Sequence, residues 1–116
     1  MVANTTEGMQ LVEWVLKRYT NSSSGREKKL TPDHTEVVDI EEEVIDRGKV
    51  YFSPEYVHLG MAIQTHPTML LDSNPPFRGA MLPAKEATLS LLEFLVRQGR
   101  AEKVVVKDSS FYRYKS

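Results

Sequence analysis

The C-terminal third of the chain carries the pattern that most narrows the fold. After Pro83, apolar side chains recur at helical spacing until Gly99 stops the run. These positions are Leu89, Leu92, Leu95 and Val96. Two β-forming stretches follow, 101–106 and 111–114, and the turn Lys107-Asp108-Ser109-Ser110 separates them. The pattern therefore predicts a helix that leads directly into a terminal β-hairpin.

Two further helices and a strand are predicted upstream. The first helix is predicted from Thr6 to about Tyr19. Trp14 lies beside the apolar stripe of this helix. We favour a place for Trp14 in the core, and the alternative is a surface patch. The stripe consists of Leu11, Val12, Val15 and Leu16. A strand is expected over residues 49–52. The next helix begins at Ser53-Pro54-Glu55, which offers a cap, a first-turn proline and a first-turn acid, and it ends before Pro67.

The segment 31–47 is an acidic insertion that has two interpretations. Thr31-Pro32-Asp33 is typical of a helix start, so we favour a helix that ends at Gly48. The β-branched pairs Val37-Val38 and Val44-Ile45 instead favour two short strands around an acidic turn. Both interpretations place this segment before the strand at residues 49–52.

Two connections are expected to be long. Residues 20–30 are rich in Ser, Asn and charged side chains and are predicted to form a flexible loop. The connection that precedes the last helix contains the breaker 72–76 but is too apolar for an idle linker, so part of it should pack down or face a partner. Its apolar residues are Met69, Leu70, Leu71, Phe77 and Met81.

Composition places the chain among single-domain proteins. It has 116 residues, of which 41% are hydrophobic, and the whole of 1–116 is expected to form one domain. The chain has no cysteine, which excludes disulfides and thiolate metal sites. Its start shows no basic region followed by an apolar one, and no apolar run reaches the length of a membrane span. We expect an intracellular, cytoplasmic protein, with the nucleus as the alternative.

The charge is unevenly distributed although the net charge is only −1. Residues 33–47 hold seven acidic side chains and one arginine, whereas residues 97–116 hold six basic and two acidic ones. Such an asymmetry can steer an oppositely charged partner or pair with itself. The alternative is that two solvated faces simply differ in charge.

No motif for catalysis or cofactor binding emerges. The glycines are isolated, which excludes a P-loop and a dinucleotide fingerprint. The histidines His34, His58 and His66 lack the short spacings of a metal site, and the residues 41–43 are consecutive glutamates that point in different directions on a helix. Ser109-Ser110 is expected in a turn. We therefore expect no enzymatic activity, no cofactor, no metal and no small-molecule substrate.

The predicted order is helix, strand, helix, helix, strand, strand, which is the order of a winged helix. The expected fold class is α+β: a single winged-helix domain with three core helices, a short strand, a C-terminal hairpin wing and enlarged loops. Segments 86–89, 100–102 and 106–108 and the first helix at 8–15 resemble the C-terminal winged helix of the small ESCRT-II subunit. That subunit carries two winged helices, and residues 20–48 have no counterpart in it.

A second resemblance is to DEP domains, winged helices that dock on membranes and receptors. The segment 8–16 is similar to the second-helix motif of that family, and 111–114 is similar to part of its later half. Leu89, Leu91, Leu95, Gly99 and Val104 also fit that later half. Both resemblances imply a fold that binds proteins or membranes rather than one that catalyses a reaction.

The expected function is therefore that of a non-enzymatic module for protein–protein interaction or complex assembly, whose partner is another protein or a second copy. Its apolar patch is predicted to combine the long connection with the wing at Met69, Leu70, Leu71, Phe77, Met81, Phe111 and Tyr112. The alternative is a DNA-binding winged helix that uses the last helix and the basic wing. Its contacts would come from Lys85, Arg97, Arg100, Lys103, Lys107, Arg113 and Lys115.

Overall fold

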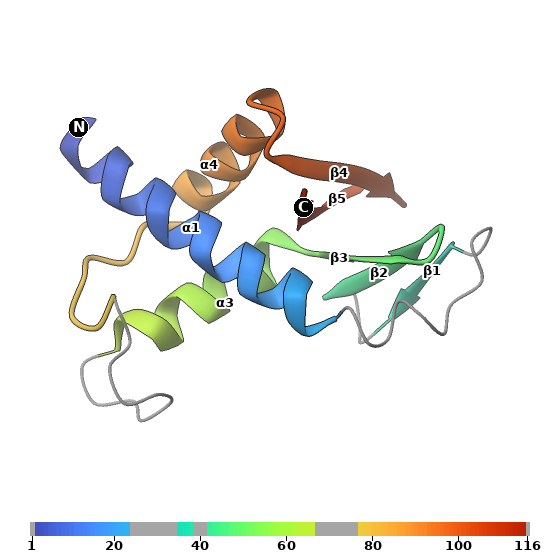
Figure 1. Cartoon of the computed structure of the whole chain (residues 1–116), viewed down its shortest axis with the longest axis horizontal. Helices are drawn as coiled ribbons and strands as arrows, with labels where there is room; N and C mark the ends of the chain where they lie inside the picture. Colours follow the sequence, from blue (N-terminus) through green and yellow to red (C-terminus); the bar gives the residue numbers. More distant parts are fainter. Residues whose placement is uncertain (1, 24–34, 39–41, 67–76, 116) are drawn as a thin grey trace.

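Helices and strands occur in separate groups along the chain. The computed structural model describes residues 2–23, 35–38, 42–66 and 77–115 (Figure 1). Its helices are α1 (Val2–Ser22), α3 (Pro54–Thr65) and α4 (Lys85–Arg97). Its strands are β1 (Thr35–Val38), β2 (Glu43–Asp46), β3 (Lys49–Phe52), β4 (Ala101–Val106) and β5 (Ser109–Tyr114). The expected α+β class is confirmed.

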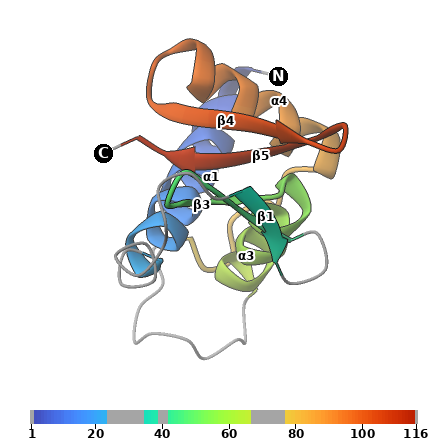
Figure 2. The same ribbon diagram turned by 90° about the vertical axis from the view of Figure 1, so that its right-hand side faces the viewer.

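The five strands form one antiparallel sheet in the order β1-β2-β3-β5-β4. The β1–β2–β3 meander and the β4–β5 hairpin join where Phe52 of β3 pairs with Tyr112 of β5. Figure 2 shows the strands in front and the three helices behind them. The helices therefore cover one face of the sheet, and α1 contacts both β3 and β5.

Local sequence signals explain most element boundaries. The side chain of Ser53 accepts a hydrogen bond from the backbone N–H of Tyr56 (3.1 Å), and Pro54 follows at the first helical position, as predicted. The predicted strand at residues 49–52 is β3. Helix α4 begins two residues after Pro83 and ends before Gly99, whose φ is 74°.

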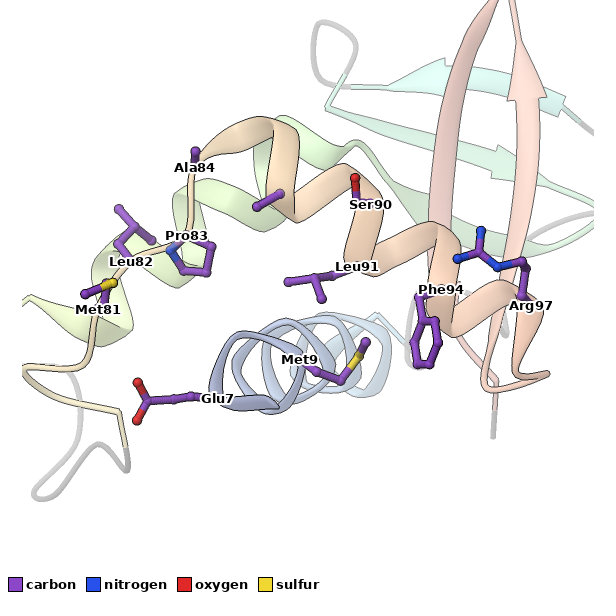
Figure 3. A pocket seen from close by; sticks show the side chains of 11 residues that line it. Glu7, Met9, Met81, Leu82, Pro83, Ala84, Ser90, Leu91, Phe94 and Arg97 are labelled. Atoms are coloured by element: carbon purple, nitrogen blue, oxygen red, sulfur yellow. The ribbon is translucent and has the colours of Figure 1, made fainter. Parts of the chain in front are cut away.

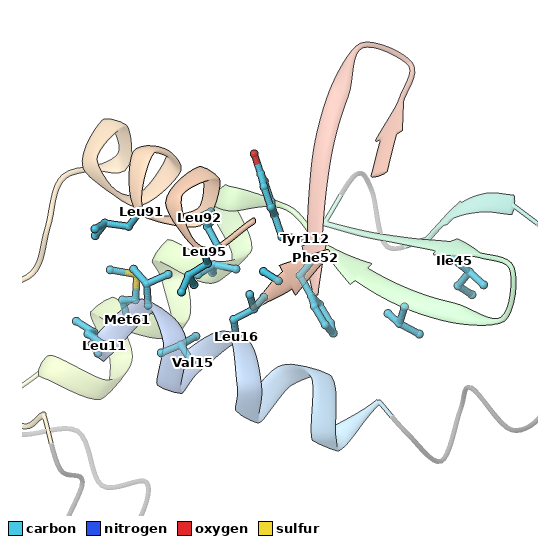
Figure 4. Close-up of a cluster of buried hydrophobic side chains, with 14 residues drawn as sticks. Leu11, Val15, Leu16, Ile45, Phe52, Met61, Leu91, Leu92, Leu95 and Tyr112 are labelled. Carbon is cyan, nitrogen blue, oxygen red and sulfur yellow. The ribbon is translucent and has the colours of Figure 1, made fainter. Parts of the chain in front are cut away.

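The core forms where α1 meets α3, α4 and the sheet (Figure 4). The predicted α1 stripe is buried, with exposed fractions of 0–2%. Other fully buried side chains that pack with it are Phe52, Met61, Leu92, Leu95 and Tyr112. Each such aliphatic or aromatic side chain contributes about 1.5–3 kcal/mol when it leaves water.

The buried stripe of α4 differs by register from the predicted one. Leu89 is 42% exposed, whereas Leu91 is 8% exposed and takes the inward position. Thr88 is fully buried because its hydroxyl donates to the carbonyl of Ala84 (3.0 Å) and so needs no water. Thr88, Leu91, Leu92 and Leu95 therefore form the inner face, and the prediction for Leu89 is wrong.

The favoured helix over 31–47 is also wrong, because β1 and β2 occupy this part of the chain. Val44 is fully buried and Ile45 is 8% exposed, so β2 buries side chains on both faces of the sheet. Arg47 and Gly48, with φ of 53° and 80°, form the tight turn that leads into β3. Pairing with β3 outweighs the helix-start signal, of which Thr31-Pro32-Asp33 lies outside the described residues.

The predicted loop at residues 20–30 begins too early, since α1 continues to Ser22. The hydroxyl of Thr20 donates to the carbonyl of Leu16 (2.8 Å) and accepts from the backbone N–H of Tyr114 (3.0 Å). This contact with β5 holds the end of the helix in place. Residues 24–30 lie outside the part of the chain that the structure describes.

The wing turn is shorter than predicted. Lys107 and Asp108, with φ of 52° and 65°, form a two-residue turn, and Val106 pairs with Ser109. Ser109 and Ser110 belong to β5 and not to the turn.

We predict that Gly60→Ala destabilises the fold by about 1–3 kcal/mol, although Gly→Ala in a helix normally stabilises. A Cβ on Gly60 would lie 2.8 Å from Val15 Cγ1 and 2.8 Å from Tyr19 Cζ, so α1 and α3 would have to separate. Urea denaturation measures the change. Ser90→Ala on the exposed face of α4 is the control and should shift the free energy of unfolding by less than about 0.5 kcal/mol. A Gly60→Ala variant as stable as this control would contradict the prediction.

Candidate interaction groove

An apolar groove of about 590 Å³ opens between the N-terminal half of α1, the segment 81–84 and the outer face of α4 (Figure 3). From α1 it is lined by Glu7 and Met9. Its wall on α4 consists of Ala87, Ser90, Leu91, Phe94 and Arg97. We call this site the groove. Its volume falls within the range of sites that bind small molecules or side chains of a partner.

Close packing of α1 against α4 sets the depth of the groove. Gly8 is buried, and a Cβ there would lie 3.3 Å from both Leu91 Cδ1 and Pro83 Cγ. The absence of a side chain at Gly8 therefore lets α1 lie against Leu91, which forms part of the groove floor. The carbonyl of Pro83 is hydrogen-bonded to Nε2 of His58 on α3 (2.9 Å), which anchors the segment 81–84.

Exposed apolar side chains gather at the groove. Among the described residues, six large hydrophobic side chains are exposed, and three of these line the groove. They are Met81 (66% exposed), Leu82 (37%) and Phe94 (38%). Because these three side chains surround one hollow, they make it the candidate interaction surface of the described residues.

Two opposite charges mark the ends of the groove. Figure 3 shows Glu7 at the end with Met81 and Leu82, and Arg97 at the other end beside Phe94. The guanidinium of Arg97 lies 5.8 Å from the centre of the Phe94 ring. Within the described part of the chain, neither Glu7 nor Arg97 forms an ion pair. The charge of Arg97 also acts on Glu93, one turn earlier on α4, but no direct ion pair there occupies its guanidinium.

The chemistry of the lining suits binding. Glu7 supplies its carboxylate and Arg97 its guanidinium at opposite ends, and Ser90 supplies a hydroxyl between them. General acid–base catalysis needs such groups within hydrogen-bond reach of one reacting atom. Within the described ranges, no group of three or more His, Cys, Asp or Glu side chains is arranged to hold a metal ion. None of the described helices is both long and apolar enough to span a membrane.

The structure separates the residues of the predicted apolar patch. Phe77 packs edge-on against Trp14, with ring centres 5.9 Å apart, so Trp14 lies against the core, as favoured. Met81 lines the groove. Phe111 and Tyr112 are only 2% and 0% exposed, so their proposed place on a surface patch is wrong: they pack on the two faces of the sheet. Met69, Leu70 and Leu71 lie outside the described residues.

Carboxylates engage three of the predicted phosphate-binding residues. Arg100 pairs with Glu13, Lys103 pairs with Glu93 at 2.8 Å, and Arg113 pairs with Glu102 at 3.3 Å. The side chain of Arg113 is in addition only 8% exposed. The other four are exposed but dispersed over both ends of α4, the wing turn and the end of β5. They are Lys85, Arg97, Lys107 and Lys115.

The carboxylate of Glu93 ties α4 to the hairpin. It accepts hydrogen bonds from Nζ of Lys103 and from the hydroxyl of Tyr112. The Lys103 bond, followed by the Tyr112 bond, lowers the pKa of Glu93 below its ordinary value. Burial, followed by the bond to Glu93, raises the pKa of Tyr112. The basic side chain of Lys103 therefore stabilises the packing of α4 against the hairpin.

Sequence reasoning missed most of the groove. Of its lining residues, only Met81 had been assigned to the apolar patch, and Arg97 was assigned to nucleic acid. The available signal was Gly8 in a helix and a second stripe on α4 that combines the small Ala87 and Ser90 with Phe94. A search of protein-family models, of curated proteins and of solved structures finds nothing that matches this chain.

We predict that Glu93→Gln makes stability less sensitive to acid and lowers it by about 1 kcal/mol at neutral pH. Because the pKa of Glu93 is lowered in the folded state, the unfolded chain takes up the proton first as the pH falls. The stabilisation is therefore complete above the ordinary pKa of 4.5 and is lost below it. Urea denaturation between about pH 7 and about pH 3 measures the slope.

The matched control is Glu86→Gln, an exposed carboxyl on the same helix. Its stability should fall with acid as steeply as that of the wild type. If the stability of Glu93→Gln fell with acid as steeply as that of the wild type, the stabilising role assigned to the Glu93 carboxylate would be contradicted.

Proposed function

We propose that this chain is a winged-helix module for protein–protein interaction and complex assembly, and that the groove is where the partner binds. The order of α1, β3, α3, α4, β4 and β5 supports the winged-helix assignment, with β1 and β2 as an added hairpin. The observation that carries the functional proposal is the groove, where exposed apolar side chains surround a hollow of about 590 Å³.

The groove supports a protein partner because apolar surface dominates its lining. Met81, Leu82 and Phe94 are accessible without any movement of the core. Aromatic side chains and Met are enriched in the buried centres of protein–protein interfaces. The small side chains of Ala87 and Ser90 between them leave room for the partner to approach α4.

DNA binding by α4 and the wing has weaker support. Along the middle of α4, the exposed residues Ala87, Leu89, Ser90 and Phe94 cannot read base edges with bidentate hydrogen bonds, and the side chains that can, Lys85 and Arg97, lie at the two ends of the helix. Three of the basic residues near the wing are paired with carboxylates. Positive charge available for phosphate is therefore dispersed.

We predict that a photoreactive p-benzoylphenylalanine at position 94 forms covalent adducts of defined mass in extracts of the cells that express this protein. The same group at Val105, an exposed apolar residue of the hairpin, should form none. In the position-94 protein, Ala87→Arg should abolish the adducts because a long charged side chain fills the groove. Gel mobility and mass spectrometry identify the adducts.

Leu89→Arg is the matched control for Ala87→Arg. It adds the same charge to an exposed position of the same helix but outside the groove, so the adducts should persist. Adducts that are equally abundant from positions 94 and 105, or that survive Ala87→Arg, would overturn the proposal.

We also predict that the protein binds labelled duplex DNA weakly and with little response to salt. If Lys85, Arg97, Lys107 and Lys115 each neutralised a phosphate, affinity would fall by about 100-fold or more between about 50 and about 200 mM salt. Fluorescence anisotropy at the two salt concentrations measures this. Tight binding with that salt dependence, lost in Lys107→Glu plus Lys115→Glu, would favour the DNA alternative.

A further inference from the structure

The two charges at the ends of the groove make it complementary to itself. Glu7 stands at one end and Arg97 at the other. Within the described residues neither forms a direct ion pair, and Arg97 interacts with Glu93 only at longer range. We propose that the occupant of the groove is a second copy of this chain, bound groove to groove about a twofold axis. This inference rests on the proposed function and specifies its partner.

A twofold axis that crosses the middle of the groove exchanges its ends. If the axis is perpendicular to the line from Glu7 to Arg97, the acidic end of each copy faces the basic end of the other. The contact between Glu7 of one copy and Arg97 of the other then occurs twice, as in any isologous dimer. Two Glu7–Arg97 pairs across the interface satisfy all four end charges.

The apolar side chains match under the same operation. Met81 is 66% exposed at the acidic end, and Phe94 is 38% exposed at the basic end. The axis brings the Met81 thioether of one copy to the Phe94 ring of the other, a favourable sulfur–aromatic contact. Ser90 lies between the two ends. Ala87, which also lines the groove, precedes it by one turn of α4, and both small side chains let α4 of each copy approach closely.

Other occupants match this charge pattern less well. A linear amphiphile with one carboxylate would satisfy Arg97 but place its apolar end beside Glu7. An anionic membrane surface would attract Arg97 and repel Glu7. A second copy satisfies both ends at once.

The expected dimer is modest in affinity. A stable interface covers about 800 Å² of each partner. That area is about a ninth of the 7090 Å² that each copy exposes. Ion pairs at the rim of such an interface adjust affinity and register, while the apolar centre supplies most of the binding. Dimerisation should therefore depend on protein concentration, which sedimentation can follow.

The test is a charge exchange at the two ends, read by sedimentation equilibrium over a concentration series of the whole chain. Glu7→Lys places two cations at each end contact and Arg97→Glu places two carboxylates there, so each variant should weaken dimerisation by about tenfold or more. The double variant restores opposite charges and should return the dimer dissociation constant to within about threefold of the wild type. Both residues are exposed, and circular dichroism verifies that the variants fold.

Matched controls carry the same charge changes outside the groove. Glu86→Lys on α4 and Lys107→Glu at the wing turn are exposed and should leave dimerisation within about twofold of the wild type. Controls that weaken the dimer as strongly as the groove variants would overturn the proposal, because net charge would then explain the effect.

A monomeric wild type throughout the series, or a double variant no better than the single ones, would also overturn self-association. A negative result for self-association does not by itself decide the proposed function. A monomer that still forms position-94 adducts with a different protein, abolished by Ala87→Arg, leaves the interaction module standing and refutes only the second copy as its occupant. Adducts to lipid in vesicle samples would assign the groove to a membrane and refute both.

Discussion

Helix α1 is the element on which the rest of the described structure depends. Its buried stripe contacts α3, α4, β3 and β5, so every other layer of the core is placed relative to one helix. The contact with α3 is close enough that Gly60 has no room for a Cβ beside Val15 and Tyr19. The contact with α4 is close for a similar reason at Gly8. The Gly8 contact determines how far α4 stands from α1, and the groove opens at the outer edge of that contact.

The basic hairpin shows how tertiary packing redefines a charge pattern. Along the sequence, residues 97–116 form a cationic segment. In the fold, Glu13 on α1 reaches Arg100, Glu93 on α4 reaches Lys103, and Glu102 on β4 reaches Arg113. The first two pairs hold the hairpin against α1 and α4, and the third joins the two strands of the hairpin to each other. A count of basic residues therefore overstates the charge that a ligand would meet.

Sequence patterns that span a few residues correctly predicted the elements that depend on interactions between nearby residues. The α1 stripe, the Ser53 cap, strand β3 and the stop at Gly99 all depend on residues a few positions apart. Segment 31–47 was misassigned because its strands gain stability from β3, which no local pattern reveals. Phe111 and Tyr112 were misplaced because period-two alternation cannot show that both faces of β5 are covered. The groove was missed because it joins segments from opposite ends of the chain.

The fold does not need the apolar side chains that line the rim of the groove. Phe94 lies on the outer face of α4, where its ring contacts Arg97, and the buried core cluster closes without it. Met81 is 66% exposed and also lies outside that cluster. Polar side chains at both positions would leave the core intact and would reduce the apolar surface that water must cover. The exposure of these side chains is therefore a cost to the isolated chain, and an occupant that covers them removes it.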